Sequence, residues 1–227
     1  MSVNSLLFNF SKLRRFKSLE FIMGTVLVGG IGLAVLFSSW LFPDGGSGVN
    51  LAMRLTPPLA DGNFLLGTDP LGRDVLARVI IGGEISLKVG FYSALGAEVL
   101  GIVMGLLSGY YGGIVDIIVM RFADVQLALP FILLAITFIA VIGGGLTNMI
   151  ILLIVSQWVQ YARLVRGSVL SLKDREFILS AQAIGVRDWR ILFQHLLPNL
   201  LGPVIVPMTL NVANNILLES SLTFLGL

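Results

Sequence analysis

One long uncharged stretch constrains this chain more than any other feature. From Val125 to Ala162 there are 38 residues without Asp, Glu, Lys or Arg. A single straight helix of that length would be about 57 Å long, whereas the hydrocarbon core of a bilayer is roughly 30 Å thick. The glycines at 143–145 therefore predict an outer hairpin between two membrane-spanning helices. Only 12% of all residues are charged, compared with about 25% in soluble domains, so we predict an all-α integral membrane protein.

The first apolar run extends from Phe21 to Phe42 and follows four basic residues, Lys12, Arg14, Arg15 and Lys17. A cleaved signal peptide is the alternative interpretation. The run is longer than a typical signal-peptide core, and Ser38-Ser39-Trp40 is a poor cleavage site. We therefore expect a retained membrane helix, and the basic flank predicts a cytoplasmic N-terminus.

Four further spans are expected, at about 86–107, from Asp116 through a kink at Pro130, up to about Arg166, and at about 200–222. In the second span, four glycines allow close helix packing: Gly90, Gly96, Gly101 and Gly105. In the third span, Arg121 and Asp124 are three residues apart and are expected to pair. The fourth span has polar positions at Ser156, Gln157 and Gln160.

The second and fifth expected spans each contain a glutamate. Glu98 lies near the middle of one, and Asn211, Asn215 and Glu219 recur at every fourth position of another, so these three share a face. A carboxylate inside the membrane costs a few kcal/mol unless it is neutral, paired or next to water. Glu98 and Glu219 should therefore face protein or a cavity. The shared face either joins helices by hydrogen bonds or lines a pathway.

A polar insert, residues 173–199, separates the last two spans. Ser171 and Asp174 fit an N-terminal capping box, and Phe177, Ala181 and Ile184 follow at helical spacing as an apolar stripe. Gly185 should end this helix in the left-handed conformation. Asp188 then begins a second helix, which Pro198 interrupts or restarts.

So short a helix is marginal alone in water and must dock on something. A membrane-surface helix and a loop folded on its own protein are both open alternatives. Six bases against three acids, counted over the insert and the ten residues before it, place the insert in the cytoplasm; the bases are Arg163, Arg166, Lys173, Arg175, Arg187 and Arg190.

Residues 43–84 are rich in Pro and Gly and contain more acids than bases, as suits the outer side. Within them, residues 66–78 predict a turn followed by a helix, in which Arg73 and Asp74 pair with neighbours. The prolines and glycines indicate a fixed turn more than a free loop.

The insert resembles the EAA loop of ABC-importer membrane subunits. Ser180-Ala181-x-x-x-Gly185 is followed, nine residues later, by His195-x-Leu197-Pro198. Leu179, Ser180 and His195 replace the family's Glu, Ala and Ile. The stretch Phe193–Asn199 is similar to the FxHxLPN of the peptide/nickel permease branch. Residues 67–78 resemble its GTDxxGRDxxSR, with Ala77 for Ser, and residues 109–113 match its GYYGG.

The resemblance covers nearly the whole chain and implies a type I ABC-importer bundle of the second-permease (C-type) branch. About five spans fall in this sequence, where the family usually has six. Residues 1–84 would form the first helix and a periplasmic segment. Residues 85–227 would form the permease core, with the coupling loop at about 168–199.

The resemblance also implies partners: a homologous permease, two ABC ATPases, a periplasmic or lipid-anchored solute-binding protein and membrane lipid. The helix at 177–184 would seat in an ATPase groove through Phe177, Ser180, Ala181, Ile184 and Gly185. Asp69, Arg73 and Asp74 would lie near the binding-protein face. ATP and Mg would be used by the partners, because the chain lacks GxxxxGK[ST].

Other cofactors and partners are not expected. The chain has no cysteine and one histidine, His195, which we interpret as structural, so no metal site is predicted. No basic cluster is interleaved with aromatics, which argues against nucleic-acid binding. We expect a non-catalytic subunit in the bacterial inner membrane.

Di- or oligopeptides are the expected substrates, and nickel, glutathione or another small solute is the alternative. Two other classes remain. An ion-coupled secondary transporter would use Glu98 and Glu219, and would show vanadate-insensitive uptake by this chain alone. If the chain is a non-transporting scaffold, uptake should continue after the chain is deleted.

Overall fold

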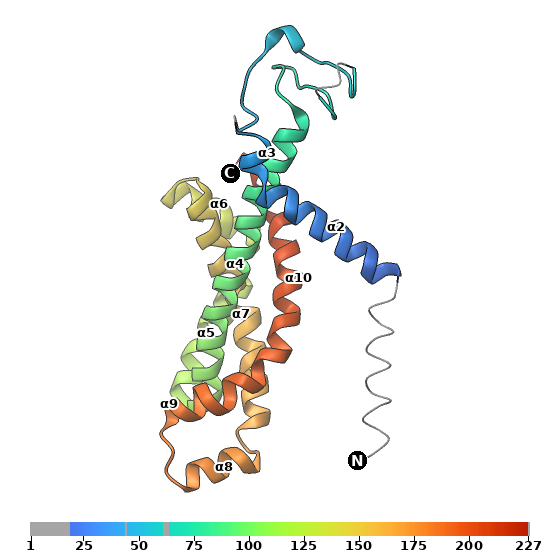
Figure 1. Cartoon of the computed structure of the whole chain (residues 1–227). Helices are drawn as coiled ribbons and strands as arrows, with labels where there is room; N and C mark the ends of the chain where they lie inside the picture. Colours follow the sequence, from blue (N-terminus) through green and yellow to red (C-terminus); the bar gives the residue numbers. More distant parts are fainter. Residues whose placement is uncertain (1–18, 44, 61–63, 227) are drawn as a thin grey trace, which may run out of the picture. The chain divides into compact units, whose positions relative to one another are not determined.

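The computed structural model describes residues 19–43, 45–60 and 64–226, and these form helices, turns and loops without a β-strand. The basic residues before the first helix lie outside the described residues. The chain divides into two compact units, Met1–Ile85 and Ser86–Leu227. Figure 1 shows the helices of each unit.

The first unit contains α2 (Leu19–Leu36), α3 (Ser38–Leu41) and a short 3-10 turn, η1 (Leu51–Met53). The expected span from 21 to 42 is thus broken at Phe37. The break is fixed from within the unit, because the Ser38 hydroxyl donates to the Glu84 carboxylate at 2.7 Å. This bond satisfies a hydroxyl that is only 2% exposed.

Helix α4 (Val75–Tyr111) begins in the first unit and continues through the second. Its 37 residues make it much longer than the expected span at 86–107. The helix ends where Gly112 and Gly113 take positive φ angles of 63° and 51°. Glycine adopts this conformation without steric cost, so the chain turns at these two residues and leads directly into the next helix.

The expected third span is divided in two. Helices α5 (Gly113–Ala128) and α6 (Phe131–Ile142) meet at 96°, so the kink expected at Pro130 is a full break. Leu129, the residue before the proline, is extended at φ −90° and ψ 125°. Steric conflict with the proline ring drives the preceding residue out of the helical region.

The remaining helices are α7 (Leu146–Leu172), α8 (Glu176–Ala183), α9 (Asp188–Arg190), a π-helical turn η2 (Ile191–Leu196) and α10 (Leu197–Phe224). The glycines at 143–145 form the predicted connection between α6 and α7. Pro198 stands at the second position of α10, where its missing N–H costs little, so the helix restarts there.

Within residues 19–43, 45–60 and 64–226, four helices are long and apolar enough to span a membrane, and the bent pair α5–α6 makes a fifth if it counts as one span. This agrees with the all-α membrane bundle and the number of spans expected from the sequence.

Helices α4 and α7 run close together along a row of glycines. A Cβ atom added to any of these glycines would lie 2.3–2.8 Å from an atom of α7, too close for a real contact. The four pairs are Gly96 with Ile154, Gly101 with Tyr161, Gly105 with Ala162 and Gly109 with Val169. Gly90 faces Ile216 of α10 in the same way. The close packing expected of these glycines is therefore confirmed.

We expect Gly101→Ala to destabilise the bundle by about 1–3 kcal/mol, because overpacking a tight contact has that cost. Its Cβ would meet the Trp158 carbonyl oxygen at 2.7 Å as well as the Tyr161 Cβ. The measurement is the thermal unfolding of the detergent-solubilised chain.

Gly167→Ala on α7 is the matched control, because nothing lies within 4 Å of its added Cβ. Alanine in an open helical position should leave stability unchanged or slightly higher. Equal unfolding temperatures for the two variants would contradict the close approach of α4 and α7.

Candidate functional site

Helix α8, the centre of the polar insert, begins at Glu176 with Arg175 as its N-cap residue and has no side-chain cap. The capping box expected from Ser171 and Asp174 is therefore wrong. Helix α7 continues to Leu172, and the Arg175 amide bonds back to the Leu172 carbonyl at 3.0 Å. The chain turns at 173–175, so Asp174 precedes the cap position.

The end of α8 follows the prediction for Gly185, whose φ is 78°. The Val186 amide donates to the Ala181 carbonyl, and the Gly185 amide to the Gln182 carbonyl, both at 3.0 Å. This pair of bonds is the Schellman motif, which satisfies two of the helix's last carbonyl groups. The chain leaves α8 in a fixed direction and reaches α9 within a few residues.

Helix α8 has one buried and one exposed apolar face, whereas a single apolar stripe was expected from the sequence. Ile178 is fully buried and Ala181 is 6% exposed, whereas Phe177 and Ile184 are 43% and 80% exposed. Ser180 and Gly185 are also exposed. The grouping of Ala181 with Phe177 and Ile184 on one docking stripe is thus wrong, because Ala181 packs inside its own chain. Leu179 is 49% exposed.

The buried face of α8 joins a hydrophobic cluster formed by several helices. Ile178 and Ala181 lie in it with residues of α4, α7, η2 and α10, including Leu106, Val165, Val169, Ile191, Leu196 and Leu200. The Tyr110 hydroxyl at the end of α4 donates to Asp188 of α9 at 2.8 Å. Figure 1 shows α8 and α9 together at one end of the second unit. Helix α8 thus shares one hydrophobic cluster with α4, α7 and α10.

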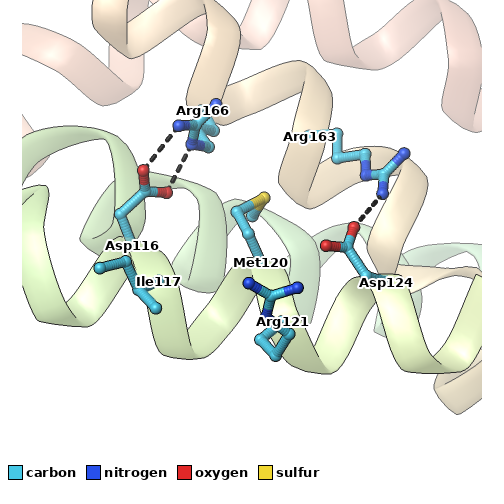
Figure 2. Close-up of a pocket in the computed structure, with 7 residues that line it drawn as sticks. All are labelled: Asp116, Ile117, Met120, Arg121, Asp124, Arg163 and Arg166. Carbon is cyan, nitrogen blue, oxygen red and sulfur yellow. Dashed lines mark hydrogen bonds and ion pairs between the residues drawn. The ribbon is translucent and has the colours of Figure 1, made fainter.

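Two ion pairs join α5 to α7 along an open groove of about 510 Å³. Arg166 donates twice to Asp116, at 2.5 and 2.6 Å, and Arg163 donates to Asp124 at 2.7 Å. Figure 2 shows both pairs, with Arg121 beside them. The expected pairing of Arg121 with Asp124 is wrong, because Arg163 on the facing helix takes that carboxylate.

The polar face of α10 makes hydrogen bonds to α4 and α7. Asn211 donates to the Tyr161 hydroxyl at 2.9 Å, Asn215 donates to Ser93 at 2.7 Å, and Ser86 donates to Glu219 at 3.0 Å. The three predicted residues do share one face, and in this conformation that face joins helices. That the same face lines a pathway stays a prediction.

The two membrane acids face protein, as expected. Glu98 is 6% exposed within the second unit. Glu219 is partly buried and accepts from Ser86 and from Thr223. Neither carboxylate has to be solvated by lipid.

The turn predicted within residues 66–78 is present and is organised around Asp69. Its carboxylate accepts from the Leu71 and Arg73 amides, at 2.8 and 3.0 Å, and from the Arg73 and Arg78 side chains, at 2.7 and 3.0 Å. Asp74 caps α4 by accepting from the Leu76 amide at 2.8 Å. Asp74 therefore acts as a helix cap.

The pKa of Asp69 reflects this arrangement. Withdrawal from water raises it, but the hydrogen bonds from the backbone and side chain of Arg73, from Leu71 and from Arg78 outweigh that effect and hold the pKa well below its ordinary value. The carboxylate is therefore ionised throughout the neutral and mildly acidic range.

Over the described ranges 19–43, 45–60 and 64–226, no group of three or more His, Cys, Asp or Glu side chains lies close enough to hold a metal ion. Two other features have functional potential. One is helix α8 with its buried and exposed faces, and the other is the set of polar contacts among α4, α7 and α10.

Comparison with known proteins gives consistent matches. Residues 101–227 match the family model described as binding-protein-dependent transport system inner membrane component. The chain is 40% identical to the dipeptide transport system permease protein DppC of Alkalihalophilus pseudofirmus, over 91% of this chain and 67% of that protein. It is 38% identical to the oligopeptide transport system permease protein OppC of Bacillus subtilis, over 94% and 70%.

A third relative is named for a different substrate. The glutathione transport system permease protein GsiD of Pectobacterium atrosepticum is 43% identical over 71% of this chain and 54% of that protein.

The turn around Asp69 should open in acid. A lowered pKa in the folded state means that Asp69 stabilises the turn fully above the ordinary carboxylate pKa of about 3.9. That contribution is lost as the pH falls from there through the lower folded value. Protection of residues 67–78 against amide hydrogen exchange should decline over this acidic range.

Asp69→Asn should show the same loss of protection at pH 7, because the amide accepts fewer charge-assisted bonds. Asp124→Asn is the control, since its ion pair lies in the other unit and should leave the turn protected. A turn that stays protected in Asp69→Asn at neutral pH would exclude this role for the carboxylate.

Proposed function

Because this chain belongs to the family of binding-protein-dependent transport system inner membrane components, we propose that its substrates are di- or oligopeptides. The chain is a permease subunit of an ABC importer of the C-type peptide branch, and a multi-pass protein of the inner membrane. With a homologous permease it forms the translocation pathway.

Peptide transport is supported by two relatives that are named as dipeptide and oligopeptide permeases and match over nine tenths of this chain. Glutathione is the second candidate, supported by a relative of 43% identity. Both substrate classes carry amide groups and apolar atoms, so the same kind of pathway suits them. Nickel lacks such support in the residues described above.

ATP hydrolysis belongs, in this proposal, to two partner ATPases that bind ATP and Mg, and a solute-binding protein delivers the substrate. The bundle end that carries α8 and α9 faces the cytoplasm, as does the N-terminus. The outer turn around Asp69, Arg73 and Asp74 faces the binding protein. The six basic residues in and beside the insert support this orientation.

One observation carries the assignment of α8 as the coupling element. Its buried face, Ile178 and Ala181, packs into the hydrophobic cluster of the bundle, while Phe177 and Ile184 remain exposed on an eight-residue helix. Because these side chains lie on a polar insert outside the expected membrane spans, lipid does not cover them, and we infer that a protein partner does. An ATPase groove is the partner that we propose for them.

The mechanism follows from these contacts. Closure of the ATPases on ATP displaces α8, and the Schellman turn and the Tyr110–Asp188 bond transmit this displacement to α4, α7 and α10. The bundle then exchanges between two packings that open the pathway inward or outward. In this mechanism the chain contributes the helices that form the pathway, and ATP in the partner subunits provides the free energy for the conformational change.

Substitutions on the exposed face of α8 should reduce transport, whereas substitutions on its buried face should reduce the stability of the fold. Ile184→Glu should leave folding intact and reduce ATP-driven uptake about tenfold or more, because a central contact residue commonly carries such a share of binding. Ala181→Glu should instead lower the thermal stability of this chain, because it forces a carboxylate into the chain's own core.

The measurements are thermal stability, pull-down of the ATPases and peptide uptake into proteoliposomes containing the whole importer. Leu179→Glu restores the residue usual in EAA loops and serves as the tolerated control. Wild-type uptake by Ile184→Glu, with its ATPases bound, would rule out α8 as the coupling element.

A further inference from the structure

One charged side chain in the groove between α5 and α7 has no partner. Arg121 lines this groove and is exposed, and within the described part of the chain it makes no hydrogen bond or ion pair. Figure 2 shows its guanidinium group between the two ion pairs of the groove. A charged side chain on a membrane helix needs water or an opposite charge beside it. Arg121 is therefore available to an anion.

The other charges of the groove are already paired. Asp116 accepts two hydrogen bonds from Arg166, and Asp124 accepts one from Arg163 on the facing helix. Three arginines against two aspartates leave the lining with one net positive charge, and the pairing assigns that charge to Arg121. The groove therefore attracts a ligand with a negative charge more strongly than a neutral or positive one.

The surface of α5 around Arg121 is apolar and exposed. Successive residues of an α-helix are turned by about 100°, which places four branched side chains within about 60° of Arg121 around the helix. They are Ile114, Ile117, Ile118 and Val125, and each is more than half exposed. A single cation within an apolar surface suits an amphiphile, whose anionic group and hydrocarbon chains match the two parts of this surface.

The groove lies at the end of the second unit that carries α8 and α9. Helix α5 begins at Gly113, shortly after Tyr110, whose hydroxyl bonds to Asp188 of α9, and Figure 1 shows the start of α5 beside α9. In the proposed orientation this end is cytoplasmic, where basic pockets between membrane helices typically bind anionic lipid headgroups. Arg121 lies about 12 Å along α5 from Gly113, and its long side chain can extend back toward the membrane surface.

The groove also lies away from the polar contacts with α10. On α7, Arg163 and Arg166 are turned by about 120° to 180° from Gln157 and Tyr161, the two residues that bond to α10. A ligand in the groove therefore meets the side of α7 that faces away from α10. A membrane lipid can reach this side without opening the contacts that join α4, α7 and α10.

We propose that this groove binds an anionic phospholipid, whose phosphate accepts hydrogen bonds from the Arg121 guanidinium group. The acyl chains lie along the exposed apolar side chains of α5. An arginine fork matches phosphate oxygens in geometry as well as in charge. A zwitterionic phospholipid has no net negative charge to balance Arg121, so it fits less well. This binding site goes beyond the proposed function and does not depend on which substrate is imported.

The test measures access to the groove in two lipids. The chain has no cysteine, so Met120→Cys places its only thiol in the groove next to Arg121. The whole importer is placed in nanodiscs of phosphatidylcholine alone or of an equal mixture with phosphatidylglycerol, and maleimide labelling of this chain is followed. Phosphatidylglycerol should slow the labelling about fivefold or more, the effect of a hydrogen bond to a charged group. Arg121→Gln should remove most of this protection, whereas Arg121→Lys keeps the charge and should keep most of it.

Two controls remove general effects of a charged membrane surface. Ser171→Cys places the thiol at an exposed position near the end of α7, outside the groove, and its labelling corrects for local pH and reagent concentration. Arg187→Gln removes a positive charge from an exposed position of the insert, and should leave the protection of Met120→Cys unchanged. Both faces of a nanodisc are open to the reagent, so the result does not depend on the orientation of the bundle.

Equal corrected labelling rates in the two lipids would overturn the proposal, as would protection that Arg121→Gln does not reduce. A thiol that is blocked in both lipids means that the second permease covers the groove. Full protection by inorganic phosphate in phosphatidylcholine alone assigns the site to a soluble anion. Either of these last two results excludes the lipid as the occupant.

A second measurement needs no cysteine. A phosphatidylglycerol with a photoreactive group on its headgroup is included in the nanodiscs, and the cross-linked peptides of this chain are identified by mass spectrometry. The wild type should give adducts on residues 116–124. Arg121→Gln should reduce them about fivefold or more relative to Arg187→Gln. Equal yields in the two variants would exclude the lipid site, whichever substrate the importer takes up.

Discussion

The close approach of α4 and α7 is the constraint on which the rest of this structure depends. Four glycines on α4 leave no room for a side chain against α7, and the Gly101 position faces the Cβ of Tyr161 at an added-atom distance of only 2.3 Å. In a membrane, apolar side chains gain little by leaving lipid, so helices are held by close packing and by bonds between polar groups. Once α4 and α7 are in contact, α10 can reach both of them, and the polar residues of all three helices meet.

Those polar contacts determine which faces of the helices pack together, which the hydrophobic pattern alone does not. Asn215 reaches Ser93 and Gln157, and Asn211 reaches Tyr161. Each bond would be lost if a helix rotated about its axis by one residue, about 100°. The polar groups thus define a rotational setting that an all-apolar bundle would lack, and α8 inherits it through the cluster around Val165 and Ile191.

The sequence predicts features that depend on neighbouring residues. Gly185 ends α8, Asp188 begins α9 and the glycines at 143–145 turn the chain, because each follows from local backbone preferences. Prediction from the sequence fails where a residue can interact either with a neighbour along the chain or with a residue on another helix. Asp124 pairs with Arg163 instead of Arg121, Ala181 turns inward, and the proline at 130 breaks its helix by 96° where a kink was expected. Arg121 is visible in sequence only as the expected partner of Asp124, and its unpaired charge becomes apparent only once Arg163 is placed on the facing helix.

The two faces of α8 have a consequence for how such a subunit can change over time. Ile178 and Ala181 are committed to folding, whereas Phe177, Leu179 and Ile184 are in contact mainly with the surroundings. Substitutions on the outer face can accumulate without a penalty in the bundle, and substitutions on the inner face cannot. In the coupling role proposed for α8, its outer face can therefore change together with the partner's groove while the packing of the bundle is kept.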